Sequence, residues 1–323
     1  MTSTSTSQRT VAVVGAGIAG AACGRALVEA GVDVQVLERG HSGGGRLASR
    51  TLADRRVDTG ASYLTARDER FVEVVDDWLR RGLARPWTDT FHVAGPHGLR
   101  ETKSGPLRYG APAGLRSLAE DLLTGTSLQL GTAVTTVGPG PTVDGRPYAA
   151  VVLAMPDPQA AWLLHPSLTD ETVAATRAWE PVLAVAAGWD VRRWDDAFDG
   201  CFVEGSDVLG WVADDGRRRG DGAPVLVAHT TSPFAADHLD DPEASADAVV
   251  RATSAVLGVD SPPAWTSVQR WTSARPAASR DAAFHLGPAR VGLCGDGWGS
   301  PKVETAYLSG RLLGEQLARD LAA

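Results

Sequence analysis

Residues 11–38 read VAVVGAGIAGAACGRALVEAGVDVQVLE, and this stretch decides the fold. Val11 to Val14 is a short apolar run that ends in Gly15, and an alanine-rich segment over 18–30 follows it. Residues 32–38 then alternate between apolar and polar side chains. A strand, a glycine turn, a helix and a second strand in this order begin a doubly wound parallel sheet. The sequence therefore predicts an α/β protein with a Rossmann-like domain.

The turn after the first strand carries a G-x-G-x-x-G pattern at Gly15, Gly17 and Gly20. The first two glycines allow a tight turn and a close approach to a pyrophosphate, and the third lets the helix pack closely on its strand. The N-terminus of the helix adds partial positive charge for phosphates. Glu38 ends the second strand, where it can accept hydrogen bonds from ribose hydroxyls. This pattern predicts a dinucleotide site rather than a turn that only packs, without separating NAD from FAD.

The rest of the chain predicts a nucleotide domain that is interrupted by a second domain. Helical spacing of apolar residues predicts helices over 67–81, 115–123, 242–257 and 304–321, and apolar runs predict strands over 127–130, 149–154 and 289–294. Turn residues predict a small hairpin over 133–146. We expect a discontinuous FAD-binding domain over 8–64, 110–156 and 286–323, a substrate domain over 65–109 and 157–285 built as an α+β unit on an antiparallel sheet, and a disordered tail over 1–7.

Composition excludes several classes of protein. The 323 residues carry a net charge of −8, so no basic face for a nucleic acid is expected. No apolar stretch approaches the roughly 20 residues that span a membrane. Cys23, Cys201 and Cys294 show no C-x-x-C spacing, which predicts no disulfide framework, no metal site and a reducing, cytoplasmic setting. Only two of the 31 basic residues are lysines, and the arginine run 217–219 reads as solvated surface. The oligomeric state stays open.

Two further segments indicate which nucleotide is bound. Gly43-Gly44-Gly45-Arg46 follows the second strand and resembles the G-G-R stretch of the amine-oxidase-like flavoproteins. Glycines let the backbone run close to a cofactor, and Arg46 offers a cation to a pyrophosphate or a flavin. Near the C-terminus, Gly295-Asp296 follows an apolar strand and precedes a helix that starts near Val303. Alone, the first would be a flexible loop with a solvent-facing arginine and the second a plausible turn; together they favour FAD, with Asp296 on the ribityl chain and the helix N-terminus directed at the flavin.

Four further stretches carry a narrower resemblance: DTGASYLTAR over 58–67, VVLAMPDPQ over 151–159, QRWTSARP over 269–276, and Gly295-Asp296 with Val303-Glu304 and the residues over 308–310. In these stretches the chain resembles renalase and its bacterial relatives. The resemblance implies non-covalent FAD and a p-hydroxybenzoate-hydroxylase-like fold. It also implies an oxidase that returns 2- and 6-dihydro isomers of NAD(P) to NAD(P)+ by hydride transfer to flavin, with O2 reduced to hydrogen peroxide.

The motifs and the resemblance together predict the residues that bind the cofactor. They are Gly15, Gly17, Ile18, Ala19, Gly20, Glu38, Arg39, Gly45, Arg46, Leu47, Ala61, Ser62, Val134, Gly295, Asp296, Val303 and Glu304. Three positions depart from the family pattern: Ser62 stands where renalases commonly have Gln, Leu64 where they have an aromatic residue, and Ser273 where they have Tyr. These departures weaken the assignment of the substrate more than that of the cofactor.

A flavin would carry the difficult step, so no nucleophile, metal or acid–base pair is required of the protein. Tyr63, His229, Trp271 and Arg275 are the candidates for lining the substrate pocket. Trp271 could stack on a nicotinamide and Arg275 could bind its phosphates. A structural role for His229 and a core role for Trp271 remain open. An amine oxidase, a dehydrogenase of a biosynthetic pathway and a flavin-bound protein without turnover are the alternative functions.

Overall fold

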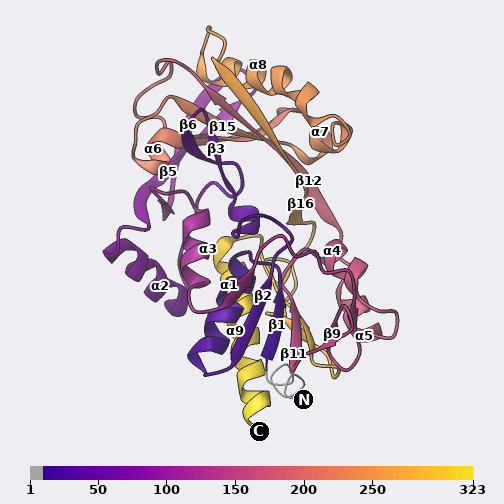
Figure 1. Ribbon diagram of the computed structural model, residues 1–323. Coiled ribbons are helices and arrows are strands. Elements are labelled where there is room, and N and C mark those ends of the chain that lie inside the picture. Colours follow the sequence, from indigo (N-terminus) through magenta and orange to yellow (C-terminus); the bar gives the residue numbers. More distant parts are fainter. Residues whose placement is uncertain (1–9) are drawn as a thin grey trace.

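The computed structural model describes residues 10–323, so the predicted tail over 1–7 lies outside the described residues. A six-stranded sheet forms the lower half of the molecule in Figure 1, in the order β17-β18-β11-β1-β2-β7. Its strands are β1 (Thr10–Val14), β2 (Asp33–Leu37), β7 (Ser127–Gln129), β11 (Ala150–Leu153), β17 (His285–Leu286) and β18 (Val291–Leu293). All neighbours are parallel except β17 and β18. Strands far apart in the sequence thus share one edge at their carboxyl ends.

Helices cover the sheet so closely that some contacts require glycine. They are α1 (Ile18–Glu29), α2 (Glu69–Arg80), α3 (Arg116–Leu122) and α9 (Val303–Ala322). On α9, a Cβ at Gly310 would lie 1.9 Å from the carbonyl oxygen of Ala19 in α1, so α1 and α9 pack with their backbones in contact. Phe71, Val75 and Trp78 bury the apolar face of α2 in the same core. The domain boundaries stay a prediction, but α2 packs with the nucleotide-binding half.

The second half is a seven-stranded sheet in the order β16-β12-β15-β14-β13-β5-β6. Its strands are β5 (Arg85–Gly95), β6 (Gly98–Gly110), β12 (Trp179–Gly188), β13 (Gly200–Val203), β14 (Leu209–Asp214), β15 (Val225–Thr230) and β16 (Trp265–Pro276). Only β13 and β5 pair in parallel. Three helices accompany this sheet: α6 (Asp215–Arg219), α7 (Ser232–Asp237) and α8 (Ala246–Leu257). The strands β12 and β16 reach down toward the first sheet in Figure 1.

Smaller elements complete the chain. They are the ribbon β3 (Ser49–Leu52) and β4 (Arg55–Asp58), the sheet β8 (Val137–Gly138), β9 (Thr142–Val143) and β10 (Arg146–Pro147), the helices α4 (Asp157–Leu163) and α5 (Thr169–Ala174), and the 3-10 turns η2 (Gly45–Leu47) and η3 (Pro242–Ser245). The hairpin expected over 133–146 is therefore a small three-stranded sheet. The predicted α/β class, with a Rossmann-like domain and an antiparallel sheet, is confirmed. Over residues 10–323, no helix is both long and apolar enough to cross a bilayer.

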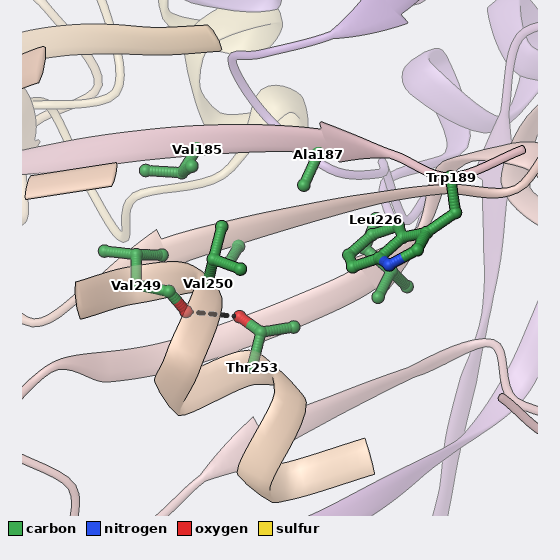
Figure 2. A pocket seen from close by; sticks show the side chains of 8 residues that line it. Val185, Ala187, Trp189, Leu226, Val249, Val250 and Thr253 are labelled. Carbon is green, nitrogen blue, oxygen red and sulfur yellow. Dashed lines mark hydrogen bonds between the residues drawn. The ribbon is translucent and has the colours of Figure 1, made fainter. Parts of the chain in front are cut away.

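The face of the large sheet under α8 is closed. A cavity of about 10 Å³ remains between the helix and the strands, where Val249, Val250 and Thr253 of α8 face Val185 and Leu226 (Figure 2). The Thr253 hydroxyl donates to the carbonyl oxygen of Val249, so the only hydroxyl there is satisfied within the helix. A volume of this size holds a single water at most. This face therefore serves as core.

Candidate active site

The glycine turn after β1 has the geometry that a pyrophosphate needs. Gly15 adopts a φ of +103°, and a Cβ there would lie 2.6 Å from the carbonyl oxygen of Ala154. A Cβ at Gly20 would lie 2.0 Å from the carbonyl oxygen of Gly15. The helix α1 begins at Ile18, and its N-cap, Gly17, offers no side chain to the first amides. These amides and the positive end of the helix can therefore bind phosphate oxygens.

Glu38 lies at the end of β2, beside the glycine turn. One carboxylate oxygen accepts from the backbone N–H of Ala16 at 2.9 Å, and the other accepts from the backbone N–H of Gly40 at 2.7 Å. Each oxygen has a second lone pair, which leaves it able to accept a hydroxyl. The carboxylate is thus held in position for ribose hydroxyls, and its role as a cofactor contact stays a prediction.

The triple-glycine segment lies directly against this turn. Gly44 pairs with Gly17 in an isolated bridge and adopts a φ of +101°. A Cβ at Gly45 would lie 3.2 Å from the Cα of Gly17, closer than most real contacts. The two glycine segments therefore pack backbone against backbone, with no room for a side chain between them. Leu47 is buried one turn later, in η2.

Arg46 joins the segment to two distant parts of the chain. Its guanidinium donates to both carboxylate oxygens of Asp296, at 2.6 and 2.8 Å, and to the carbonyl oxygen of Ala274 in β16 at 3.0 Å. The guanidinium carbon lies 4.8 Å from the centroid of the Trp179 ring. The two halves of the molecule thus meet at one arginine. The structure brings Arg46 and Asp296 together, although the sequence assigned them separate contacts with FAD.

Reasoning from sequence missed the residues that support Arg46. Asp157 accepts from the Trp179 indole at 2.8 Å and forms an ion pair with Arg280 at 3.1 Å. Arg280 also donates to the carbonyl oxygen of Gly297, beside Asp296. The only signal for this group was the position of Asp157 within the VVLAMPDPQ match, and no local pattern marked Trp179 or Arg280.

The loop over 58–63 connects the Arg46 segment to the large sheet. The backbone N–H of Ala61 donates to the carbonyl oxygen of Arg46 at 2.9 Å. From the large sheet, the Trp271 indole donates to the carbonyl oxygen of Thr59 at 2.8 Å, and the Trp211 indole donates to the Ser62 hydroxyl at 2.9 Å. Two tryptophans of the large sheet therefore hold this loop at its two ends.

Arg218 also binds the loop over 58–63, and its position shows that the surface prediction for this residue was wrong. The sequence placed 217–219 on the solvated surface, but the side chain of Arg218 is fully buried. It forms an ion pair with Asp215 and donates to the carbonyl oxygens of Ser62 and Asp58 at 3.0 and 3.2 Å. The short helix α6 turns it inward, between the sheet and the loop. Burial raises the pKa of the Asp58 carboxyl, and the charge of Arg218 opposes that rise.

The four pocket candidates separate into two groups. Tyr63 packs with Trp211 and two other aromatic rings, and burial raises the pKa of its phenol. Burial lowers the pKa of His229 to about 4, so the ring is neutral at pH 7. Trp271 faces the same side of the sheet and holds Thr59. Arg275, in contrast, is half-exposed and bound to Glu180 at 2.6 Å.

The remaining residues predicted to contact the cofactor differ in burial and in hydrogen bonding. Val303 begins α9, whose N-cap residue provides no side-chain hydrogen bond. Glu304 is buried and accepts from the backbone N–H groups of Arg67 and Asp68, at 2.5 and 2.8 Å, so its carboxylate holds the start of α2. Gly295 has a φ of +147° and donates to the Ser309 hydroxyl. Arg39 is exposed, and Val134 packs beside the β11 core.

This set of residues fits FAD. An uncapped helix N-terminus and bare glycines suit a pyrophosphate, Glu38 suits a ribose, and Arg46 with Asp296 lies where the large sheet covers the nucleotide sheet. The fold and the site define an FAD-dependent oxidoreductase. Residues 13–78 match the model of the NAD(P)-binding Rossmann-like domain, and residues 91–313 match that of the flavin containing amine oxidoreductases. The chain belongs to the flavin containing amine oxidoreductase family.

Solved structures share the whole fold. Cyclohexylamine oxidase from Brevibacterium oxydans aligns with a TM-score of 0.78 at 14% identity, over 98% of this chain and 100% of its own. A putative protoporphyrinogen oxidase from Exiguobacterium aligns at 0.75 and 14%, over 97% and 99%. Putrescine oxidase bound to putrescine aligns at 0.75 and 15%, over 98% and 99%. Identities this low speak for the fold alone.

Proposed function

We propose that the chain is a renalase-like FAD oxidase that converts 2- and 6-dihydro isomers of NAD(P) into NAD(P)+, with O2 reduced to hydrogen peroxide. The observation that supports it is the wall of Tyr63, Trp211, Trp271 and neutral His229 beside the loop over 58–63. FAD, when bound, accepts the hydride and passes the electrons to O2. The protein has to bind a flat ring, orient it and exclude water.

Each of these tasks has residues that suit it. Aromatic side chains stack on a flat heterocycle and provide apolar area with few rotatable bonds. The indoles of Trp211 and Trp271 are fixed by hydrogen bonds to Ser62 and Thr59, so their planes are set before a substrate arrives. His229 adds a ring that carries no charge at pH 7. A fixed wall of this kind favours the alignment that hydride transfer needs, at about 3–3.5 Å between donor and acceptor.

Amine oxidation is the second candidate, and the family assignment favours it, as do the amine oxidases among the aligned structures. Against it, no residue set for amine chemistry is recognisable in the sequence, and one of the two lysines, Lys103, is bound to Glu101 on an exposed strand. A dehydrogenase of a biosynthetic pathway and a flavin-bound protein without turnover are further candidate functions.

The deciding experiment is anaerobic mixing of the FAD-loaded protein with the 2-, 4- and 6-dihydro forms of NAD and NADP, and separately with putrescine and cyclohexylamine. We expect the 2- or 6-isomer to bleach the flavin absorbance under anaerobic conditions. Hydrogen peroxide should then form when air is admitted. Bleaching by the amines alone would replace the proposal with amine oxidation. If no compound bleaches the flavin, a pathway-specific substrate or a role without turnover takes its place.

We also propose the cofactor contacts named from the sequence, non-covalent binding of FAD and a cytoplasmic setting. Cys23, Cys201 and Cys294 are all free and buried, which suits a reducing compartment. Denaturation followed by filtration tests the mode of binding, because a non-covalent flavin passes through the filter while the protein is retained.

A further inference from the structure

Arg108 is a buried cation with no negative partner among the described residues. It lies near the end of β6 and is 8% exposed. Its guanidinium carbon lies 4.1 Å from the centroid of the Phe91 ring and 6.0 Å from that of Tyr63. Its Nε and Nη1 atoms are buried and have no hydrogen-bond partner within residues 10–323.

Arg218 shows what this chain does with a buried guanidinium whose role is structural. Arg218 is bound by Asp215 and by two carbonyl oxygens, which leaves only its Nε without a partner within residues 10–323. Removing a charge from water costs several kcal/mol unless it is paired and hydrogen-bonded, so an unpaired buried arginine is unusual. The stacking on Phe91 holds the plane of the Arg108 guanidinium but supplies only about 1–2 kcal/mol. The Nε and Nη1 groups need an acceptor that residues 10–323 do not supply.

The position of Arg108 connects it to the active site. Tyr63 directly follows Ser62, which the Trp211 indole holds, and the rings of Tyr63 and Phe91 lie 5.4 Å apart. Phe91 and Trp211 also contact each other, at 4.7 Å between centroids. The Arg108 guanidinium interacts with the Tyr63 side chain and keeps its Nε and Nη1 unpaired, so it lies in the aromatic cluster at one end of the proposed substrate wall.

We propose that Arg108 is an anion-binding residue of the substrate pocket and takes a carboxylate or phosphate group of the substrate. A guanidinium presents its N–H groups as a planar fork that matches both kinds of oxyanion. The assignment rests on the proposed active site, but not on the dihydronicotinamide substrate. It does predict that the natural substrate carries a negative group at some distance from the carbon that is oxidised.

The test measures the binding of small anions to the FAD-loaded protein. The shift in flavin absorbance reports the binding and needs no turnover. Benzoate serves as the carboxylate probe, phenyl phosphate as the phosphate probe and benzyl alcohol as the neutral match. We expect at least one anion to bind about tenfold or more tightly than benzyl alcohol. Arg108→Met should weaken that anion by about ten- to a hundredfold, the range for charge-assisted hydrogen bonds, and leave benzyl alcohol unchanged.

Two further variants make the result decisive. Arg100→Met removes an exposed arginine from the same strand and should leave anion binding intact. Arg108→Lys keeps the charge without the fork, so it should recover part of the affinity and remains informative if Arg108→Met does not fold. Equal binding of anions by the Arg108→Met and native proteins would overturn the proposal, as would equal affinity of the native protein for all three probes. The substrate proposal fails separately, when dihydronicotinamides do not bleach the flavin.

Discussion

The two faces of the seven-stranded sheet are made by the same strands and are covered in different ways. Ala228 and His229 are consecutive residues of β15, yet Ala228 packs in the core under α8 while His229 faces the loop over 58–63. Under α8 the side chains are aliphatic and leave about 10 Å³. On the other face, the Trp271 indole and the Arg218 guanidinium donate to backbone oxygens of the loop, and the His229 Nε2 is buried without a partner within the described chain.

We infer that the face under α8 contributes to stability and that the face toward the loop also contributes to function. A face whose groups are all satisfied internally has nothing left to offer a ligand. A face with fixed rings and unpaired donors lowers the stability of the fold, and the same donors can bind a ligand. The comparison predicts that substitutions on the α8 face change stability alone, and that substitutions on the loop face change stability, binding or pH dependence according to what each residue holds.

The largest effect is expected for Arg218→Ala on the loop face. The substitution leaves Asp215 buried without its cation and frees two carbonyl oxygens of the loop, so the free energy of unfolding should fall by about 3–5 kcal/mol. Urea unfolding measures the loss. Arg251→Ala, on the exposed side of α8, is the matched control and should change stability by less than about 0.5 kcal/mol. Equal losses in the two variants would contradict the buried assignment.

Leu226→Ala tests the α8 face. Leu226 is 1% exposed and lines the small cavity, so the truncation should cost about 2–5 kcal/mol of unfolding free energy. The rate of flavin reduction under saturating substrate should stay at the native value, because no atom of this face reaches the loop. A slower reduction in folded protein would show that the two faces are coupled.

Glu38→Ala tests the nucleotide cradle, which neither face forms. The change removes a carboxylate that is held between the amides of Ala16 and Gly40, and with it hydrogen bonds worth roughly 1.5–3 kcal/mol. FAD should therefore bind about ten- to a hundredfold more weakly, as measured by fluorescence titration of the apoprotein. Glu38→Gln keeps the shape and should recover part of the affinity. Native FAD affinity in the alanine variant would mean that Glu38 does not contact the ribose.

The nucleotide half could be predicted from sequence because its requirements are local. Gly15, Gly17 and Gly20 are needed by a turn and a helix start within ten residues, and the alternation over 32–38 follows from the pleat of one strand. The fold class, FAD and the class of enzyme predicted in this way are confirmed by the family models and the aligned structures. The assignment of individual contacts stays a prediction.

The loop face could not be predicted because its meaning depends on long-range partners. No sequence pattern near Arg218 predicts that its guanidinium binds the carbonyl oxygen of Ser62. The run of arginines over 217–219 is typical of solvated surface. Arg275 shows the converse, since a promising motif position is bound to Glu180 and half-exposed. Arg108 had no local signal at all. Only the tertiary structure shows which arginines are paired, which are exposed and which are buried alone.

The smallest expected effect concerns the pH dependence of stability, and it tests whether the loop face holds His229 uncharged. Burial lowers the pKa of His229 to about 4, and the charges of Arg218 and Arg275 lower it further, whereas an unfolded histidine titrates near 6.5. Between these two pH values the unfolded chain binds a proton that the folded protein refuses, so stability falls as the pH falls from 6.5 toward 4.

His229→Gln removes the titrating ring, so the unfolded chain no longer takes up this proton. The unfolding free energy of the native protein should therefore drop more between pH 7 and pH 5 than that of the glutamine variant, by on the order of 1 kcal/mol. Urea unfolding at the two pH values gives the difference. His285, in β17 of the nucleotide sheet, also has a pKa lowered by burial, so His285→Gln should likewise reduce the pH dependence without any change to the loop face. Identical pH dependence in native protein and His229→Gln would mean that the folded protein does not hold the ring uncharged, and the proposed substrate wall would lose its neutral histidine.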